Sequence, residues 1–136
     1  MAGYSGTPLP QKLGIKPGSQ LALIGAPAGF ERVLGPLPDG VRTTTRASAA
    51  LDVVVLFTKD AGALTKKFAP LAKAIAPAGA LWIAWPKKSS GVRTDLDENL
   101  VRAIGLEEGL VDVKVCAIDE TWSGLKFVVR RADRPK

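Results

Sequence analysis

The sequence has 136 residues, 46% of them hydrophobic and 24% charged, which is the composition of one folded domain and excludes a disordered chain. No apolar run approaches the roughly 20 residues of a membrane helix, and the N-terminus MAGYSGTPLP does not resemble a signal peptide. The net charge of +6 favours anionic partners, but most lysines and arginines are scattered, which argues against a continuous nucleic-acid-binding stripe.

The absence of histidine restricts the chemistry that this chain can perform. Any acid–base or nucleophilic reaction would have to use aspartate, glutamate, lysine, serine or tyrosine. Zinc sites built from cysteine and histidine are excluded, because Cys116 is the only cysteine. We interpret Cys116 as a packed thiol, and a lone cysteine fits a reducing compartment. We therefore expect a cytoplasmic protein with no membrane segment.

The N-terminal stretch, residues 1–19, is rich in glycine and proline. Tyr4, Leu9, Leu13 and Ile15 are its apolar anchors. We expect an arm that packs on the domain or exchanges with a neighbouring subunit of a homo-oligomer, and the alternative is a loose tail. The main domain is expected over residues 20–131, with a short tail over 132–136.

Three apolar runs follow in the chain: LALIG (21–25), DVVVLF (52–57) and LWIAW (81–85). They are continuous rather than alternating, which is typical of parallel strands covered on both faces. A threonine-rich segment, VRTTTR (41–46), predicts a more exposed strand. We expect a helix over 27–35, with Pro27 at its first position and Gly35 at its stop.

A longer helix is predicted over residues 60–76. Its apolar side chains fall on one stripe, and Asp60 is a suitable N-cap. Pro70 should kink or split this helix, because proline deletes a hydrogen bond in the middle of the run. Ala78 and Gly79 then end it. The members of the stripe are Leu64, Phe68, Leu71 and Ile75.

A further helix is predicted over residues 94–105. Asp95 and Glu98 have the spacing of a capping box, and Gly105 is the expected stop. The buried stripe is expected at Leu100, Val101 and Ile104.

The C-terminal third alternates between apolar and polar residues, which predicts two antiparallel strands joined by the loop DETWSG (119–124). In the first of these strands, one face is expected to carry Val111, Val113, Val115 and Ala117. In the second, one face is expected to carry Leu125, Phe127 and Val129.

These elements predict an α/β protein with three layers and a mostly parallel sheet, a reduced Rossmann-like fold. Right-handed crossovers give the strand order 2-1-3-4-6-5, with strand 6 antiparallel. This layout resembles the sheet of class I methyltransferases with one early strand–helix unit missing.

The ligand crevice of such a sheet lies at the carboxyl ends of its parallel strands, where the strand order reverses. The order should bring the loop after the third main strand towards the loop of the terminal hairpin. We predict that these two loops form a ligand site. Its residues are Lys87, Lys88, Ser89, Ser90 and Arg93 from the first loop, and Asp119, Glu120, Thr121, Trp122 and Ser123 from the second.

Each part of this site has an alternative interpretation. The cations and hydroxyls around Gly91 suit a phosphate or carboxylate, but the same residues also suit a solvated turn. Trp122 would either stack on a ligand or fold back onto Lys87 and Trp85 as structural cover. Asp119 is expected to form a structural ion pair with a lysine of the first loop.

The loop GAPAG (25–29) is where a nucleotide-binding turn would lie. Gly25, Ala26 and Gly29 are weaker candidates for ligand contact, because Pro27 removes one backbone amide. Arg46 follows the second strand, where adenosine-binding folds place an acidic residue. Both features count against an adenosine ligand.

Several segments together resemble a family of short bacterial proteins that is known only as a domain of unknown function. The most specific are WPKKSSG and KVCAIDETWSGLKFVVRR. The resemblance covers nearly the whole chain and implies a reduced Rossmann-like fold, but no activity and no cofactor.

We therefore expect a non-catalytic or regulatory module that binds a small anionic molecule or a protein partner. The alternatives are a small S-adenosylmethionine-dependent transferase and a nucleic-acid-binding protein. The sequence identifies no cofactor and no metal ligands.

Overall fold

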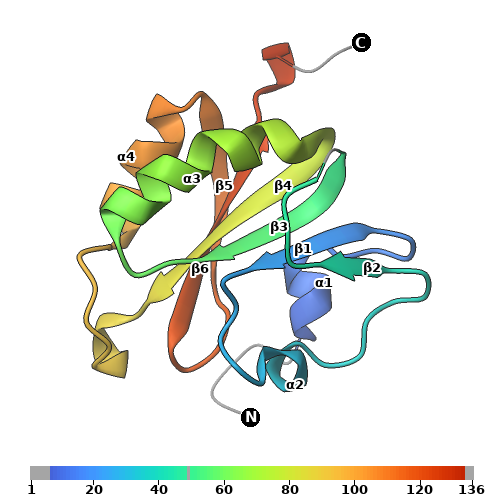
Figure 1. Cartoon of the computed structure of the whole chain (residues 1–136), viewed down its shortest axis with the longest axis horizontal. Coiled ribbons are helices and arrows are strands. Elements are labelled where there is room, and N and C mark those ends of the chain that lie inside the picture. Colours follow the sequence, from blue (N-terminus) through green and yellow to red (C-terminus); the bar gives the residue numbers. More distant parts are fainter. Residues whose placement is uncertain (1–6, 49, 134–136) are drawn as a thin grey trace.

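The central element of this computed structural model is a six-stranded sheet with helices on both faces (Figure 1). The structure describes residues 7–48 and 50–133. The strands are β1 (Gln20–Ile24), β2 (Arg42–Thr44), β3 (Leu51–Phe57), β4 (Ile75–Pro86), β5 (Leu110–Ala117) and β6 (Trp122–Val129). The α-helices are α1 (Leu9–Leu13), α2 (Phe30–Leu34), α3 (Ala61–Ala74) and α4 (Glu98–Glu107), and 3-10 turns span Lys88–Ser90 and Arg131–Asp133.

The strand order is β2-β1-β3-β4-β6-β5, which confirms the predicted topology. β1 pairs in parallel with β2 and β3, and β3 pairs in parallel with β4. β6 is antiparallel to both β4 and β5, so β5 runs in the same direction as the parallel strands. None of the helices in the described ranges is long and apolar enough to cross a membrane.

The sheet has an apolar core on each face. On the front face, α3 and α4 contribute Leu64, Phe68 and Val101 to a core that includes Phe127. On the back face, α1 and α2 contribute Leu13 and Phe30 to the other core. β3 and β4 are buried on both sides, as predicted, because residues of each strand alternate between these two cores. Leu9 and Ile15 are also buried, whereas Tyr4 lies outside the described residues.

Helix α3 begins as predicted but ends earlier. The Asp60 carboxylate accepts a hydrogen bond from the Gly62 amide at 2.8 Å and caps the helix. The helix ends at Ala74, because Ile75 already has extended backbone and begins β4. The prediction of a helix to residue 76 was therefore wrong at this end. Pro70 lies inside the helix without splitting it, and its exposed position lets water reach the carbonyl that it leaves unpaired.

Helix α4 differs from its prediction at both ends. Its N-cap is Asp97, which accepts from the Leu100 amide at 2.8 Å, and not Asp95. Gly105 does not stop the helix but lies within it, where a Cβ would collide with the Phe127 ring. Leu100 is 36% exposed and not part of the buried stripe, because Val101 and Gly105, four residues apart, form the face that meets the core.

Helix α2 is shorter than predicted. It begins at Phe30, because Gly29 adopts a left-handed conformation (φ 79°) and forms the N-cap, so Pro27 precedes the helix. Gly35 ends it, as expected.

A β-bulge in β5 overturns the expected face pattern of this strand. Asp112 lies opposite Phe127 and Lys114 lies opposite Lys126, so Val113 is one extra residue between two consecutive partners. Val111 and Val115 therefore point to opposite faces. The prediction for β6 is confirmed, because Leu125 and Phe127 lie in the front core and Val129 packs against it.

Candidate ligand site at the carboxyl edge of the sheet

The carboxyl ends of β1, β3, β4 and β5 lie along one edge of the sheet, and four loops leave from it (Figure 1). The strand order reverses between β1 and β3, so this edge contains the switch point where α/β sheets bind ligands. The loops are residues 25–29, 58–60, 87–97 and 118–121.

The loop after β4 and the loop of the terminal hairpin are neighbours, as the sequence predicts. The Lys87 amide donates a hydrogen bond to the Thr121 carbonyl at 2.8 Å. Pro86 and Trp122 face each other in the antiparallel pair of β4 and β6. Two stretches about thirty residues apart in the sequence therefore meet at one edge.

Ser90 was predicted as a ligand contact, but its hydroxyl makes hydrogen bonds within its own loop. Its Oγ donates to the Lys87 carbonyl at 2.6 Å and accepts from the Val92 amide at 3.1 Å. Gly91 follows in a left-handed conformation (φ 75°), which closes the turn. Ser90 thus shapes the loop.

The same loop is also fastened to the start of α3, which the sequence analysis missed. The Thr94 hydroxyl donates to the Lys59 carbonyl at 2.6 Å, and the Asp95 carboxylate accepts from the Ala61 amide at 2.9 Å. Asp95 therefore caps a helix more than thirty residues away instead of its own. No local spacing could have identified this contact, since its partner belongs to another segment.

The hairpin loop uses Asp119 in a similar way. One carboxylate oxygen accepts from both the Thr121 and Trp122 amides at 2.8 Å. The prediction of an ion pair with a lysine gave the wrong role, because the short turn brings these two amides within reach of the carboxylate.

Trp122 is a core residue. Its side chain is 7% exposed, and its ring meets the Phe57 ring edge to face with a centroid distance of 5.1 Å. Of the two interpretations, structural cover therefore describes its position, with Phe57 as its ring partner, whereas Trp85 lies in the core of the opposite face. Burial leaves little of the indole for stacking on a ligand.

The side chains that remain available are mostly charged or hydroxylic. Within the described residues, the exposed side chains of Lys88, Ser89, Arg93 and Glu120 make no hydrogen bond or ion pair. Thr121 and Ser123 are partly exposed. Among these described residues no cluster of three carboxylate or thiol ligands could hold a metal ion.

The loop after β1 has a structural reason for its first glycine. A Cβ at Gly25 would lie 2.9 Å from the Phe57 carbonyl oxygen, so the close approach of β1 and β3 requires glycine. Ala26 and Gly29 are exposed, and a Cβ at Gly29 would meet nothing within 4 Å. Arg46, beyond the end of β2, is exposed too.

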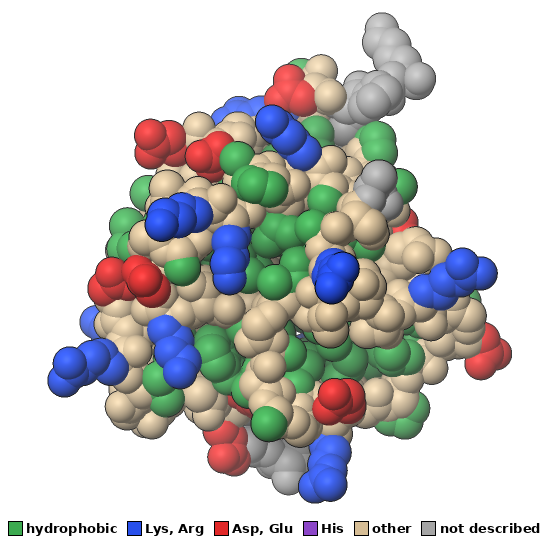
Figure 2. Space-filling model, viewed as in Figure 1, with side chains coloured by type: hydrophobic (Ala, Val, Ile, Leu, Met, Phe, Trp, Pro, Cys, Tyr) green, Lys and Arg blue, Asp and Glu red, His purple; other side chains and the backbone are tan. Residues whose placement is uncertain are grey.

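A small pocket opens on the front face next to this edge. It has a volume of about 250 Å³ and lies between α3 and the ends of β1 and β2. Figure 2 shows this face of the molecule, with lysine and arginine side chains around exposed hydrophobic surface. The lining residues are Ile24, Thr45, Ala47, Lys66, Lys67, Pro70 and Leu71.

No protein-family model matches this chain, and no curated protein matches it in sequence. Solved structures do match it. A SAM-dependent methyltransferase from Aquifex aeolicus superposes with a TM-score of 0.63 and 14% identity, over 88% of this chain and 87% of that one. The N-methyltransferase NodS from Bradyrhizobium japonicum WM9 gives 0.57 and 15%, over 91% and 98%.

Magnesium protoporphyrin IX methyltransferase from Synechocystis PCC 6803, a structure with bound SAM, superposes with a TM-score of 0.58 and 14% identity. The match covers 84% of this chain and 71% of that one. The chain has the methyltransferase fold. Identities this low show the fold alone, and the resemblance to an uncharacterised bacterial family stays a prediction.

Proposed function

We propose that this chain is a non-catalytic binding module that takes a small anionic ligand at the carboxyl edge of its sheet. The observation that supports this is the unequal use of charge at that edge. Three carboxylates there, those of Asp60, Asp95 and Asp119, are engaged with backbone amides, and Glu120 is the exposed exception. The cations Lys88 and Arg93 are exposed beside them.

This distribution favours an anion over a cation or a neutral molecule. Carboxylates that accept amide hydrogen bonds have fewer lone pairs to offer, whereas exposed lysine and arginine side chains keep all their donors. Arginine can bind a phosphate or carboxylate through two parallel hydrogen bonds, and lysine can bind it as a point charge. The edge is therefore suited to a phosphate or carboxylate group.

The arrangement also supports binding over catalysis. Acyl or phosphoryl transfer needs a nucleophile within hydrogen-bonding distance of a base. The Ser90 hydroxyl donates to a carbonyl, and the Asp119 oxygen next to this loop accepts two amides. Neither is arranged as a member of a nucleophile–base pair.

Methyl transfer from S-adenosylmethionine is the second candidate, and the shared fold favours it. Two residues of this chain oppose it. Pro27 removes an amide from the loop after β1, and the cationic Arg46 follows β2. A cationic side chain there would neither accept hydrogen bonds from ribose hydroxyls nor attract a sulfonium cation.

Calorimetric titration of the whole chain separates the two candidates. The ligands are inorganic phosphate, citrate, S-adenosylmethionine and S-adenosylhomocysteine. The proposal expects heat with an anion, and at least a tenfold weaker affinity for that anion in Lys88→Ala/Arg93→Ala. The matched control, Lys73→Ala/Arg42→Ala, removes the same charge from exposed positions outside the four loops.

Equal affinities in both double variants would overturn the proposed site. Heat with the two S-adenosyl compounds, and none with the anions, would favour methyl transfer instead.

A further inference from the structure

Four lysines gather on the back face of the sheet, outside the loops of the carboxyl edge. Lys114 of β5 and Lys126 of β6 lie directly opposite each other, and β4 places Trp82 on the other side of Lys126. Side chains opposite each other in an antiparallel pair share one face and have Cβ atoms about 5 Å apart. Lys12 and Lys16, from α1 and the turn after it, complete this group, which we call the back-face lysine cluster.

Helix α1 fixes the position of the cluster. The Trp82 indole donates a hydrogen bond to the Leu13 carbonyl at 3.1 Å, which holds the end of α1 on the sheet. A Cβ on Gly14 would lie 4.0 Å from the Lys126 Nζ, so this ammonium group lies beside the turn that follows the helix. The two pairs of lysines therefore meet where α1 crosses β6.

The lysines act on one another and on Cys116. Partial burial, and then the charges of Lys114 and Lys16, lower the pKa of Lys126 below its ordinary value. Burial raises the pKa of the Cys116 thiol, while Lys12 and Lys114 oppose that shift. All four cations thus share one local field.

Among the described residues, Lys16, Lys114 and Lys126 form no ion pair with a carboxylate. The ion pairs found there join Arg102 to Glu98 and Asp112, at the front face of the sheet. Like charges placed directly opposite each other on a sheet destabilise it. A fold that keeps such a pair, with two further cations beside it, presents a site with strong attraction for a polyanion.

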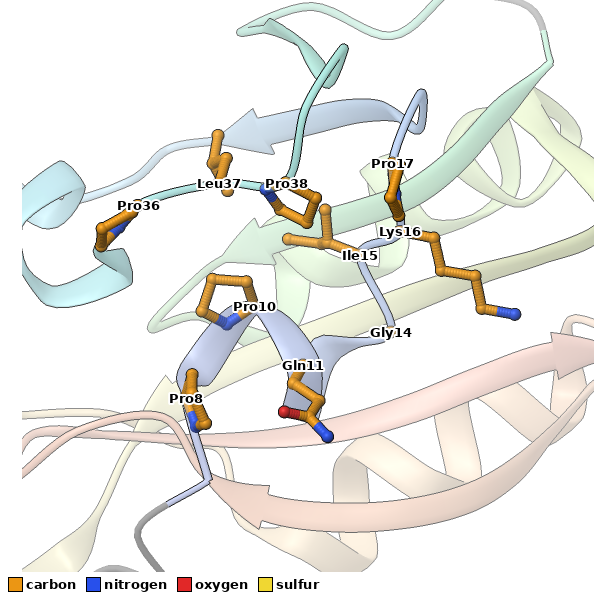
Figure 3. Close-up of a pocket in the computed structure, with 10 residues that line it drawn as sticks. All are labelled: Pro8, Pro10, Gln11, Gly14, Ile15, Lys16, Pro17, Pro36, Leu37 and Pro38. Carbon is orange, nitrogen blue, oxygen red and sulfur yellow. The ribbon is translucent and has the colours of Figure 1, made fainter.

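An apolar groove adjoins the cluster. It has a volume of about 560 Å³, which is within the range of small-molecule sites, and it runs between α1 and the segment before β2. Proline rings form most of its walls, and Lys16 and Gln11 extend beyond them towards the strands (Figure 3). The lining residues are Pro8, Pro10, Gln11, Gly14, Ile15, Lys16, Pro17, Pro36, Leu37 and Pro38.

We propose that the back-face lysine cluster and this groove together bind a small molecule that carries two or more phosphoryl groups on an apolar or planar body, such as a nucleoside triphosphate. The phosphoryl groups lie among the ammonium groups, and the body lies against the proline rings. Several lysines spaced along two strands and a turn suit a row of phosphoryl groups better than one carboxylate. This site is separate from the one proposed at the carboxyl edge.

The first test measures the charged half of the site by calorimetry at low salt. Inorganic triphosphate is the probe, and Lys114→Met/Lys126→Met is the variant, since methionine keeps most of the unbranched side chain and removes its charge. The expected result is a loss of affinity of tenfold or more. Lys66→Met/Lys73→Met on α3 is the matched control and should keep the wild-type affinity. Equal affinity in both variants, or no heat with the wild-type chain, would overturn the proposal.

The second test measures the groove. Leu37→Ala should weaken the binding of adenosine triphosphate several-fold and leave the binding of inorganic triphosphate unchanged, because only the nucleoside touches the apolar wall. Equal losses for both ligands would overturn the role of the groove. A single-stranded oligonucleotide that binds more tightly than adenosine triphosphate through the same lysines would overturn the choice of a small molecule.

Two controls separate this site from the fold and from the carboxyl edge. Lys16→Met changes an exposed turn outside the sheet, so its loss of triphosphate affinity cannot come from a damaged strand. Wild-type affinity in Lys16→Met would count against the proposal. Lys88→Ala/Arg93→Ala should bind inorganic triphosphate at the back face as the wild type does, whatever happens at the carboxyl edge. A common loss in this variant and in Lys114→Met/Lys126→Met would refute two separate sites.

Discussion

At the carboxyl edge, Asp60, Asp95 and Asp119 accept hydrogen bonds from backbone amides, and the Trp122 indole is buried against Phe57. On the back face, Lys114 and Lys126 face each other without a carboxylate among the described residues to pair with either. Both regions gather polar side chains, but in the first they stabilise loops and in the second they oppose the fold. A cluster of polar residues therefore indicates a ligand site only if its side chains are not already engaged in contacts that stabilise the fold.

Trp122→Ala is expected to have the largest effect on this comparison. If the indole is structural, its removal leaves a cavity and lowers the free energy of unfolding by about 3 to 5 kcal/mol. Urea denaturation measures this change. Trp122→Phe keeps an aromatic ring against Phe57 and should lose much less. A cost below about 1 kcal/mol for alanine would return Trp122 to the list of ligand contacts.

Asp119→Ala should lower stability by about 2 kcal/mol, because two amides lose a charged acceptor. Glu120→Ala is the neighbouring control and should change the free energy of unfolding by less than about 0.5 kcal/mol, since its side chain is exposed and makes no hydrogen bond or ion pair among the described residues. Equal effects in the two variants would remove the distinction between committed and available carboxylates at this edge.

Lys114→Glu should raise the free energy of unfolding, unlike the two changes above. It converts a like-charge pair with Lys126 into an attractive one, and we expect stability to rise by up to about 1 kcal/mol at low salt. The gain should shrink as salt screens the charges, which thermal denaturation at two ionic strengths would detect. Lys73→Glu on α3 is the control. A loss of stability in Lys114→Glu would mean that the lysines do not repel each other.

The smallest effect concerns the reactivity of Cys116. Because burial raises the pKa of its thiol, the thiolate fraction at pH 8 should be below that of free cysteine. The rate of alkylation by iodoacetamide should therefore keep increasing above the pH at which free cysteine levels off. Lys114→Met removes a cation that lowers this pKa, so the variant should react more slowly at pH 8, by about twofold. A faster reaction in Lys114→Met would contradict the effect of the Lys114 charge on the Cys116 thiol.

The fold was predictable because its signals are local and repeated. Continuous apolar runs identified the strands that are covered on both faces, and the handedness of crossovers then fixed the strand order. The ends of helices were harder to predict, since Asp97 and not Asp95 caps α4 and Gly105 packs on a ring from a distant strand. In each case a tertiary contact decided between two local signals.

The candidate site was predictable in position but less so in composition. Strand order alone brought residues 86–94 next to 119–124. It could not reveal that Ser90, Asp119 and Trp122 serve the fold, because their partners are backbone groups or a ring of another element. The back-face lysines were missed, since their convergence depends on α1 and on a bulge.

Val113, the additional residue of β5, places an acidic and a basic side chain on opposite faces of the sheet. In an unbroken strand Asp112 and Lys114 would share a side, and the carboxylate would neutralise its neighbours among the lysines. The inserted residue sends Asp112 to Arg102 on α4, at 2.8 Å, and leaves Lys114 with Lys126. A regular strand that kept Val113 in its pairing would place the acid and the base on one face, so this bulge decides whether the sheet carries separated charges at all.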